Sequence, residues 1–260
     1  MSSNQAERFD YYMGHDIGRV RPVNEDAIFA FSAQVMRMDT LTPIGLFIIA
    51  DGMGGHSSGE RASAKAISEF TGDFFRTVYL KAIDARGDSA DLGGEMARCL
   101  ERTNATIYSD IPNSGTTFSA LLLVGNSYWI VHVGDSRIYY FSGNQDEALL
   151  TKDHSLVQMM IDLGEITEEE GKTHIRRNVI LRSVGFESSV QPDIYQGTFE
   201  AGDRFLLCCD GVWSVVGTEA WEEILRSPEP IQDQARRLVE AANEAGESRE
   251  IGRASCRERV

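Results

Sequence analysis

Apolar residues along the chain fall into short runs that are typical of buried β-strands. The runs cover residues 27–31, 45–50, 116–124, 127–133, 136–141 and 203–209. Several runs are apolar at every position, which indicates that both faces of the sheets are covered. Short turns at Gly125-Asn126 and Gly134-Asp135 predict antiparallel hairpins, so that the middle strands form a meander.

Between the strand runs, apolar residues recur at the spacing of amphipathic helices. One stripe consists of Ala62, Ala66, Phe70, Phe74 and Val78, and a second of Met96, Leu100 and Ile107. A later helix pair is predicted at 218–226 and 231–245. We therefore expect an α+β fold, a four-layer α-β-β-α sandwich of two antiparallel sheets flanked by helix pairs. Residues 151–185, which are charged and mostly helical in pattern, are expected to form a surface flap.

The charge of the chain excludes several classes of partner. Its 260 residues include 40 acidic and 25 basic ones, and the formal net charge of −15 disfavours nucleic acid and anionic membranes. No apolar run approaches the roughly 20 residues of a membrane span, and the N-terminus lacks a signal-peptide pattern. We expect a cytoplasmic monomer. The four cysteines show no disulfide or zinc spacing, so they are predicted to be buried or idle thiols.

Two apolar runs end in the same way, at a carboxylate followed by glycine. FIIADG ends at Asp51-Gly52, and LLCCDG ends at Asp210-Gly211. A carboxylate at the mouth of a buried strand is costly to desolvate unless it is paired or binds a metal, and no lysine or arginine lies within several residues of Asp51. Carboxylates and backbone carbonyls suit hard ions such as Mg²⁺ or Mn²⁺, whereas zinc would favour His and Cys clusters. The glycines after Asp51 would let the backbone turn sharply and offer a carbonyl to the ion.

The acidic residues also have ordinary interpretations. Asp51 could instead cap the helix that begins near Ser58, and DGMGGH is no Walker A loop because no Gly-Lys-Ser/Thr follows it. Glu25 and Asp26, which open a strand, could form a solvated strand end. Asp135 could be a turn former in a hairpin. It is the whole set of acids at strand ends that favours a metal site.

Seven motifs resemble, in their order and spacing, those of the metal-dependent protein phosphatases of the PP2C type in their compact bacterial form. They are GRVRPVNEDA (18–27), ADGMGGHSSGE (50–60), SGTTFSALLL (114–123), HVGDSRIYYF (132–141), LTKDHSLV (150–157), RNVILRSVG (177–185) and LLCCDGVW (206–213). Seven motifs in the family's order are specific, and they span nearly the whole chain. The resemblance implies a protein serine/threonine phosphatase with two Mg²⁺ or Mn²⁺ ions between the sheets and a mobile flap beside them. Phosphorylated proteins, the substrates of a serine/threonine kinase, are the implied partners.

The resemblance also implies roles for individual acidic residues. Asp51 would bridge the two ions, Glu25 and the Gly52 carbonyl would complete the protein ligands of one ion, and Asp210 would bind the other. In bacterial members a third, looser ion lies between the positions that match Asp135 and Asp210. Each of these residues is present at the matching place in the sequence.

The implied reaction follows from charge. A phosphoserine or phosphothreonine ester is close to a dianion and repels hydroxide. Two metal ions would lower the pKa of a bridging water and aim it at phosphorus. Arg21 matches the family's arginine that grips the substrate phosphate, a role that suits its planar fork of donors. Animal members carry a histidine after the bridging Asp-Gly where this chain has Met53, so the proton donor stays open between His56 and a metal-bound water.

The C-terminal segment departs from the family pattern. Members end with a GSxDN motif, whose aspartate is the last metal ligand, and a closing strand, whereas GESRE (246–250) is followed here by IGRASCRERV. Because EIGRASCRERV is similar to the translation of a common sequencing adapter, we interpret residues 1–250 as a C-terminally truncated phosphatase domain and residues 251–260 as a non-native tail that is not strand-like. Glu250 would then stand at the position of the missing ligand, one methylene longer. Loss of the closing strand would expose a sheet edge and lower stability and activity.

Two other functions stay open on the sequence alone. A catalytically impaired sensor could keep the fold and bind a partner through the flap, although the intact Arg21, Glu25, Asp51 and Asp210 disfavour this. A metal-dependent phosphodiesterase or small-molecule phosphatase could use the same scaffold. The flap could equally be an ordinary pair of surface helices with no role in substrate selection.

Overall fold

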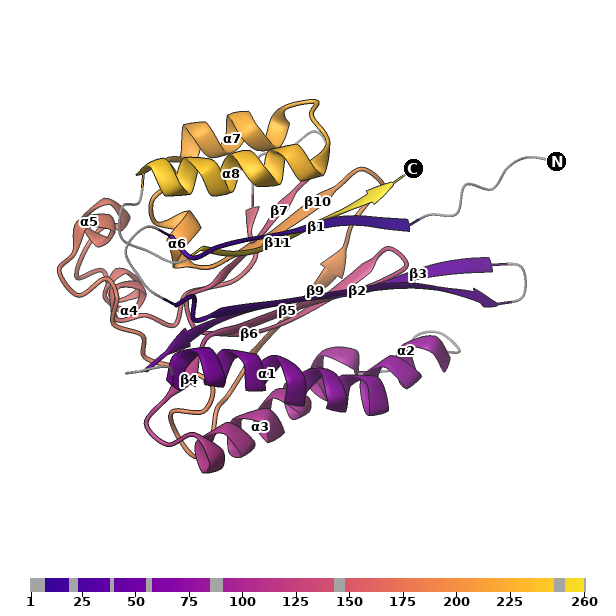
Figure 1. Ribbon diagram of the computed structural model, residues 1–260, viewed down its shortest axis with the longest axis horizontal. Coiled ribbons are helices and arrows are strands. Elements are labelled where there is room, and N and C mark those ends of the chain that lie inside the picture. Colours follow the sequence, from indigo (N-terminus) through magenta and orange to yellow (C-terminus); the bar gives the residue numbers. More distant parts are fainter. Residues whose placement is uncertain are drawn as a thin grey trace.

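The apolar runs form two antiparallel sheets that lie face to face (Figure 1). The computed structural model describes residues 8–18, 23–37, 40–54, 58–84, 91–142, 148–245 and 251–259. The first sheet has the order β2-β3-β5-β6-β9, in which the strands are β2 (Asp26–Arg37), β3 (Thr40–Met53), β5 (Phe118–Val124), β6 (Ser127–Val133) and β9 (Asp193–Thr198), with β4 (Gly115–Thr116) paired to β3. The second sheet has the order β1-β11-β10-β7-β8, in which the strands are β1 (Arg8–Asp16), β11 (Ile251–Arg259), β10 (Arg204–Cys208), β7 (Arg137–Phe141) and β8 (Ala148–Leu149).

Helices cover the outer faces of both sheets (Figure 1). They are α1 (Ser58–Phe74), the π-helical η1 (Phe75–Tyr79), α2 (Leu80–Asp84) and α3 (Leu92–Asp110) on the first sheet, and α7 (Thr218–Arg226) and α8 (Ile231–Ala245) on the second. Every residue of the two predicted helical stripes is fully buried. The α+β class with antiparallel sheets and helices is therefore confirmed.

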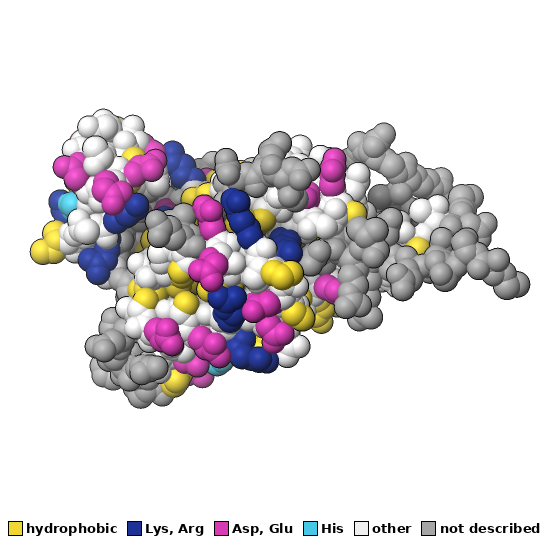
Figure 2. All heavy atoms as spheres, turned by 90° about the horizontal axis from the view of Figure 1, so that it is seen from above, with side chains coloured by type: hydrophobic (Ala, Val, Ile, Leu, Met, Phe, Trp, Pro, Cys, Tyr) yellow, Lys and Arg dark blue, Asp and Glu magenta, His cyan; other side chains and the backbone are white. Residues whose placement is uncertain are grey.

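The solvent face of α7 and α8 is charged. Ion pairs such as Arg236–Asp233 and Arg237–Glu229 lie on it, and Figure 2 shows acidic and basic side chains interspersed on this side of the molecule. None of the helices in the described part of the chain combines the length and apolarity that a membrane crossing would need.

The period-two alternation of strand side chains divides the first sheet between two cores. In β3, Leu46, Ile48 and Ala50 pack toward the helices, whereas Phe47 and Ile49 point between the sheets. All five side chains are fully buried. Because complete burial of a large apolar side chain contributes about 1.5–3 kcal/mol, both faces of β3 stabilise the fold. This explains why the run is apolar at each position.

The turn at Gly134-Asp135 does not form the predicted hairpin. β6 pairs within the first sheet, whereas β7 pairs within the second, so the chain crosses between the sheets at residues 134–136. Gly134 has a φ of 111°, and a Cβ on it would lie 2.6 Å from the Cβ of Thr117, so the crossing requires glycine. The meander is correct for the β5–β6 hairpin. It is wrong at the next step, because a short turn does not reveal which sheet the following strand joins.

Residues 251–259 form β11, so the expectation that this segment is not strand-like was wrong. β11 lies between β1 and β10 and pairs antiparallel with both of them. The predicted open edge is thus occupied in the structure. The backbone N–H and C=O groups of two neighbouring strands need partners, and this need outweighs a side-chain pattern that does not favour a strand. The non-native origin of the segment stays a prediction.

The flap contains less helix than predicted. Within residues 151–185, only α4 (Leu156–Asp162) and α5 (Glu168–Thr173) are helical, and turns and irregular segments make up the rest. α5 begins with a capping box, in which the side chains of Thr167 and Glu170 each accept a hydrogen bond from the other residue's backbone N–H. The many charged residues of this segment therefore form caps and exposed turns more than continuous helix.

Candidate active site

The strand ends that carry these acids lie at one end of the sandwich, beside α4, α5 and the short helix α6 (Asp210–Trp213) (Figure 1). In the β2–β3 pair, Asp26 lies directly opposite Asp51. Ile28, Ala30 and Ile49 pack between the sheets. Because alternate residues of a strand share a face, Asp26 lies on the same face of β2 as Ile28, and Asp51 lies on the same face of β3 as Ile49. Two carboxylates are therefore held side by side at the mouth of the inter-sheet space.

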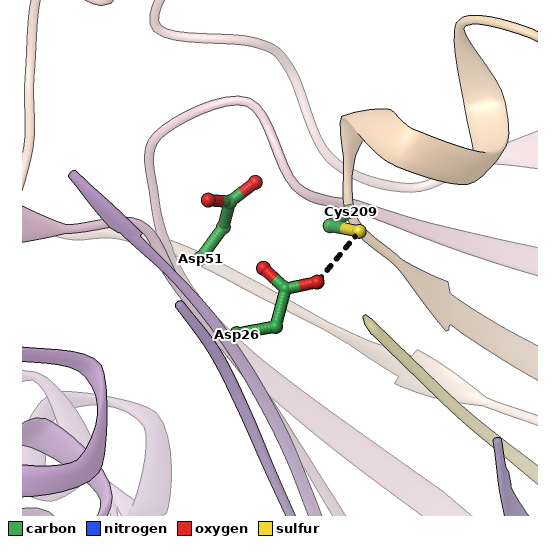
Figure 3. Close-up of side chains that lie close together, drawn as sticks. All are labelled: Asp26, Asp51 and Cys209. Atoms are coloured by element: carbon green, nitrogen blue, oxygen red, sulfur yellow. Dashed lines mark hydrogen bonds between the residues drawn. The ribbon is translucent and has the colours of Figure 1, made fainter. Parts of the chain in front are cut away.

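Cys209 joins this pair from the second sheet. It follows Phe205 and Leu207 on the inter-sheet face of β10. Its Sγ donates a hydrogen bond to Oδ2 of Asp26 over 3.2 Å (Figure 3). One oxygen of each carboxylate and the sulfur all lie within 4.8 Å of one another. Three side chains of metal-ligand type thus converge from two sheets.

The backbone of Asp51 is fixed by two threonines. Its N–H donates to Oγ1 of Thr117 over 2.9 Å, and its carbonyl accepts from the N–H of Thr117 and from Oγ1 of Thr116 over 2.8 and 2.9 Å. Thr117 Oγ1 is also 2.7 Å from Oγ of Ser136, in the crossing between the sheets. Asp51 therefore belongs to a strand with its carboxylate next to Asp26, and the alternative of a cap for α1 was wrong.

Glu25 lies directly before β2, and its side chain points toward Gly59 of α1. Its carbonyl accepts the N–H of Gly52 over 3.1 Å, and a Cβ on Gly59 would lie 2.7 Å from its Oε1. A Cβ on Gly52 would lie only 2.2 Å from the carbonyl oxygen of Gly59. Gly52 is therefore needed because backbones approach closely there, and not for the predicted sharp turn, since β3 continues to Met53. The roles of Glu25 and of the Gly52 carbonyl as metal ligands stay predictions.

Asp135 and Asp210 form a second acidic pair, at the crossing and at the first residue of α6. Burial, and then the negative charges of Asp210 and Asp153, raise the pKa of Asp135 to about 8. The carbonyl of Asp135 accepts a hydrogen bond from Nε1 of Trp213 over 2.9 Å, which ties the crossing to α6. A divalent cation between the two carboxylates would relieve their repulsion.

A cavity of ≈ 540 Å³ opens beside this second pair. It lies between α6 and the flap, from which Val157, Lys172 and Arg177 line it. Arg137 links the flap side of the cavity to α6 by contacting a residue of each. The Nε and Nη2 of Arg137 donate to the two carboxylate oxygens of Asp153 over 3.0 and 2.8 Å, and its guanidinium carbon lies 3.6 Å from the centroid of the Trp213 ring.

The oxygen donors of the described acids fit the predicted metal chemistry. Asp26, Asp51, Asp135 and Asp210 offer carboxylates of the type that Mg²⁺ and Mn²⁺ prefer, and Cys209 adds one softer donor. Arg21, His56 and Glu250 lie outside the described residues. Their predicted roles in phosphate contact, proton donation and metal ligation stay predictions.

Sequence reasoning named Asp26 only within the set of acids at strand ends, with no ligand role of its own, and did not select Cys209 for the site. The available signal for Asp26 was its spacing of two residues from Ile28, which packs between the sheets. Glu25, one residue earlier, points to the opposite side, toward α1. The signal for Cys209 was its position directly before Asp210 at the end of an apolar run. Neither signal could be used without knowing which face of each strand points between the sheets.

The comparison with protein families agrees with this site. The chain matches the family model of protein phosphatase 2C over residues 22–253, and it belongs to that family of metal-dependent protein serine/threonine phosphatases. It is 33% identical over 237 residues to the serine/threonine phosphatase stp of Listeria monocytogenes, with 89% of this chain and 88% of that protein covered. It is 34% identical over 243 residues to the serine/threonine protein phosphatase PstP of Mycobacterium tuberculosis, with 91% of this chain but only 42% of PstP covered.

Solved structures show the same fold. The Mycobacterium tuberculosis phosphatase PstP/Ppp superimposes with a TM-score of 0.79 at 31% identity, covering 97% of this chain and 100% of that one. The catalytic domain of PstP in complex with two manganese ions gives a TM-score of 0.77 at 30% identity, covering 98% and 100%. The antiparallel sheets and flanking helices of the chain are therefore those of bacterial PP2C-type phosphatases.

Proposed function

We propose that the chain hydrolyses phosphoserine and phosphothreonine esters in proteins at a centre of two Mg²⁺ or Mn²⁺ ions, with a third ion between Asp135 and Asp210. The observation that supports this most is the meeting of Asp26 and Asp51 from the first sheet with Asp135 and Asp210 at one end of the sandwich, beside a cavity. The two manganese ions of the PstP catalytic domain add support by similarity.

The residues of the chain would hold and orient this centre. Bound ions supply a water of lowered pKa and neutralise charge on the phosphoryl oxygens. The carboxylate of Asp51, whose backbone Thr117 fixes on both sides, offers its oxygens to the ions. Asp26 offers a second carboxylate next to it, oriented by the hydrogen bond from Cys209. Arg21 is predicted to donate two hydrogen bonds to the phosphate.

The cavity supports a protein substrate. Its wall combines apolar side chains such as Val157 and Trp221 with the cationic Lys172 and Arg177. This mixture suits the residues that flank a phosphorylated serine or threonine. The flap, residues 151–185, would then form a subdomain that contributes to substrate selection. A monomer acting in the cytoplasm stays a prediction.

The test combines a substrate panel with metal removal. Phosphopeptides are expected to be hydrolysed faster than nucleotides, EDTA is expected to abolish activity, and calorimetry is expected to count at least two Mn²⁺ ions per chain. Asp51→Asn should lose both binding and turnover, whereas Asp233→Asn, a matched change at a half-exposed carboxylate on α8, should keep both. Activity that survives EDTA, or a chain that binds no metal, would contradict the proposal.

The C-terminal interpretation can be tested in the same assay. We propose that replacing residues 250–260 with a family-like end, which carries aspartate at the last ligand position, raises turnover and Tm. The shorter carboxylate would lie where the family's ligand does. Equal turnover and Tm in the two chains would refute the interpretation.

A further inference from the structure

The two adjacent cysteines at the end of β10 have opposite surroundings. Cys208 lies in the apolar core with Leu238 and Ala242 of α8. Cys209 lies on the inter-sheet face, where its thiol meets the carboxylate of Asp26. The alternation of the strand therefore places one thiol among apolar residues and the other among metal ligands.

The donor set around Cys209 differs in kind from an all-oxygen site. Mg²⁺ and Mn²⁺ prefer oxygen ligands, whereas Zn²⁺ and Cd²⁺ gain affinity from a thiolate. In a tetrahedral zinc site, bond lengths of about 2.3 Å to sulfur and about 2.0 Å to oxygen place those two ligand atoms roughly 3.5 Å apart. The sulfur of Cys209 is 3.2 Å from Oδ2 of Asp26, and an oxygen of Asp51 completes a set whose atoms lie within 4.8 Å of one another (Figure 3).

We propose that Asp26, Asp51 and Cys209 form a site for thiophilic divalent cations, Zn²⁺ or Cd²⁺, at the metal centre. Binding replaces the hydrogen bond between the thiol and Asp26: the S–H proton leaves to solvent, and the thiolate and the two carboxylates ligate the cation. Because the set contains Asp51, a thiophilic ion there excludes the hard ions and inhibits the enzyme. The site rests on the donor geometry, so it is testable whether or not the chain hydrolyses phosphoproteins.

Cadmium is a direct probe, because a bond from thiolate to Cd²⁺ gives a charge-transfer absorption in the ultraviolet. The test uses the full chain carrying Cys256→Ser, after EDTA treatment and removal of the chelator, and titrates it with Cd²⁺. We expect a band that saturates at one Cd²⁺ per chain. Adding Cys209→Ser should abolish it, while Cys99→Ser, which changes a buried thiol on α3, should leave it intact.

A comparison of Cd²⁺ and Mn²⁺ affinities shows whether Cys209 is a metal ligand or has only a structural role. Cys209→Ser is expected to weaken Cd²⁺ binding at least about tenfold, the lower end of the loss for a removed partner in a metal site, and to weaken Mn²⁺ binding much less, because the serine hydroxyl can still donate a hydrogen bond to Asp26. Asp26→Asn should weaken Cd²⁺ binding while keeping the band, because the sulfur remains. An unchanged band in Cys209→Ser, or no band in the parent chain, would overturn the proposal, as would equal losses of Cd²⁺ and Mn²⁺ affinity in Cys209→Ser.

Discussion

The two sheets of the sandwich reach their packing by different routes. In the first sheet, β3, β5 and β6 carry continuous apolar runs, and the helices α1 and α3 bury full stripes against them. In the second sheet, β1 and β11 come from opposite ends of the described chain and are joined through backbone pairing. The comparison teaches that side-chain pattern specifies β3, β5 and β6, whereas β1 and β11 depend on satisfying strand edges.

The largest expected effect is a difference in activity loss between Asp51, at the end of β3, and Asp135, in the crossing to the second sheet. Asp51→Asn, at the end of β3, should lower kcat/KM about 10³-fold, on the order of 4 kcal/mol of transition-state stabilisation. Asp135→Asn, in the crossing to the second sheet, should lower it only about tenfold, because it serves the looser third ion. The measurement is phosphopeptide hydrolysis in excess Mn²⁺, with circular dichroism as a check of folding. Equal losses would remove the distinction between the two acidic pairs.

Core truncations compare how strongly the two sheets are packed. Phe70→Ala should cost about 4 kcal/mol, because the fully buried ring on α1 packs against Phe118 of the first sheet at 4.8 Å between ring centroids. Leu238→Ala on α8, also fully buried, should cost about 3 kcal/mol because it leaves a smaller cavity. Urea unfolding measures both. A greater loss at Leu238 would show that the second core carries more of the stability.

A proline in β11 tests the dependence of the second sheet on backbone pairing. Ser255 is paired with Tyr12 of β1 and with Leu206 of β10. Ser255→Pro should cost about 3 kcal/mol, since the residue can no longer donate a ladder hydrogen bond, whereas Ser255→Thr should be nearly neutral. Hydrogen exchange should accelerate in β10 and remain slow in β3. Full tolerance of the proline would show that β11 is not held in the sheet.

The smallest expected effect is a pH dependence that belongs to the first sheet. Burial lowers the pKa of His132 on β6 to about 3, and its ring bonds Ser119 and the Lys152 carbonyl. Below about pH 6.5, His132 binds a proton in the unfolded chain but stays neutral in the folded chain. The free energy of unfolding therefore decreases as the pH falls below that value. From pH 7 to pH 5 this group should remove about 2 kcal/mol. Urea unfolding of the parent and of His132→Gln should show that difference in slope, and parallel curves would contradict it.

Much of the first sheet and its helices could be predicted, because burial on both sides leaves a pattern in the residues themselves. The apolar run before Asp51 and the stripe that contains Phe70 are examples. β1 and β9 lack such runs; β9 alternates half-buried and exposed residues and pairs with β6 through its backbone. Those strands depend on a neighbour that the local sequence does not describe.

The candidate site was predictable in its acids and not in its arrangement. Asp51 and Asp210 could be found because each ends an apolar run. Asp26 and Cys209 required the direction of each side chain relative to the inter-sheet space, which follows from strand register. The place of Asp135 required the crossing at Gly134, which a turn-based prediction assigned to a hairpin.

Trp213 gives the molecule an optical reporter of its own. The indole nitrogen donates a hydrogen bond to the Asp135 carbonyl, and the Arg137 guanidinium lies over the face of the ring. Trp213 is the last residue of α6, the short helix that begins at Asp210. A cation that settles beside those carboxylates changes the electric field across the ring, and the emission of the indole responds to such a field. Replacing Trp129 and Trp221 with phenylalanine would leave Trp213 as the single tryptophan, and ion entry could then be followed in real time through its emission with no added dye.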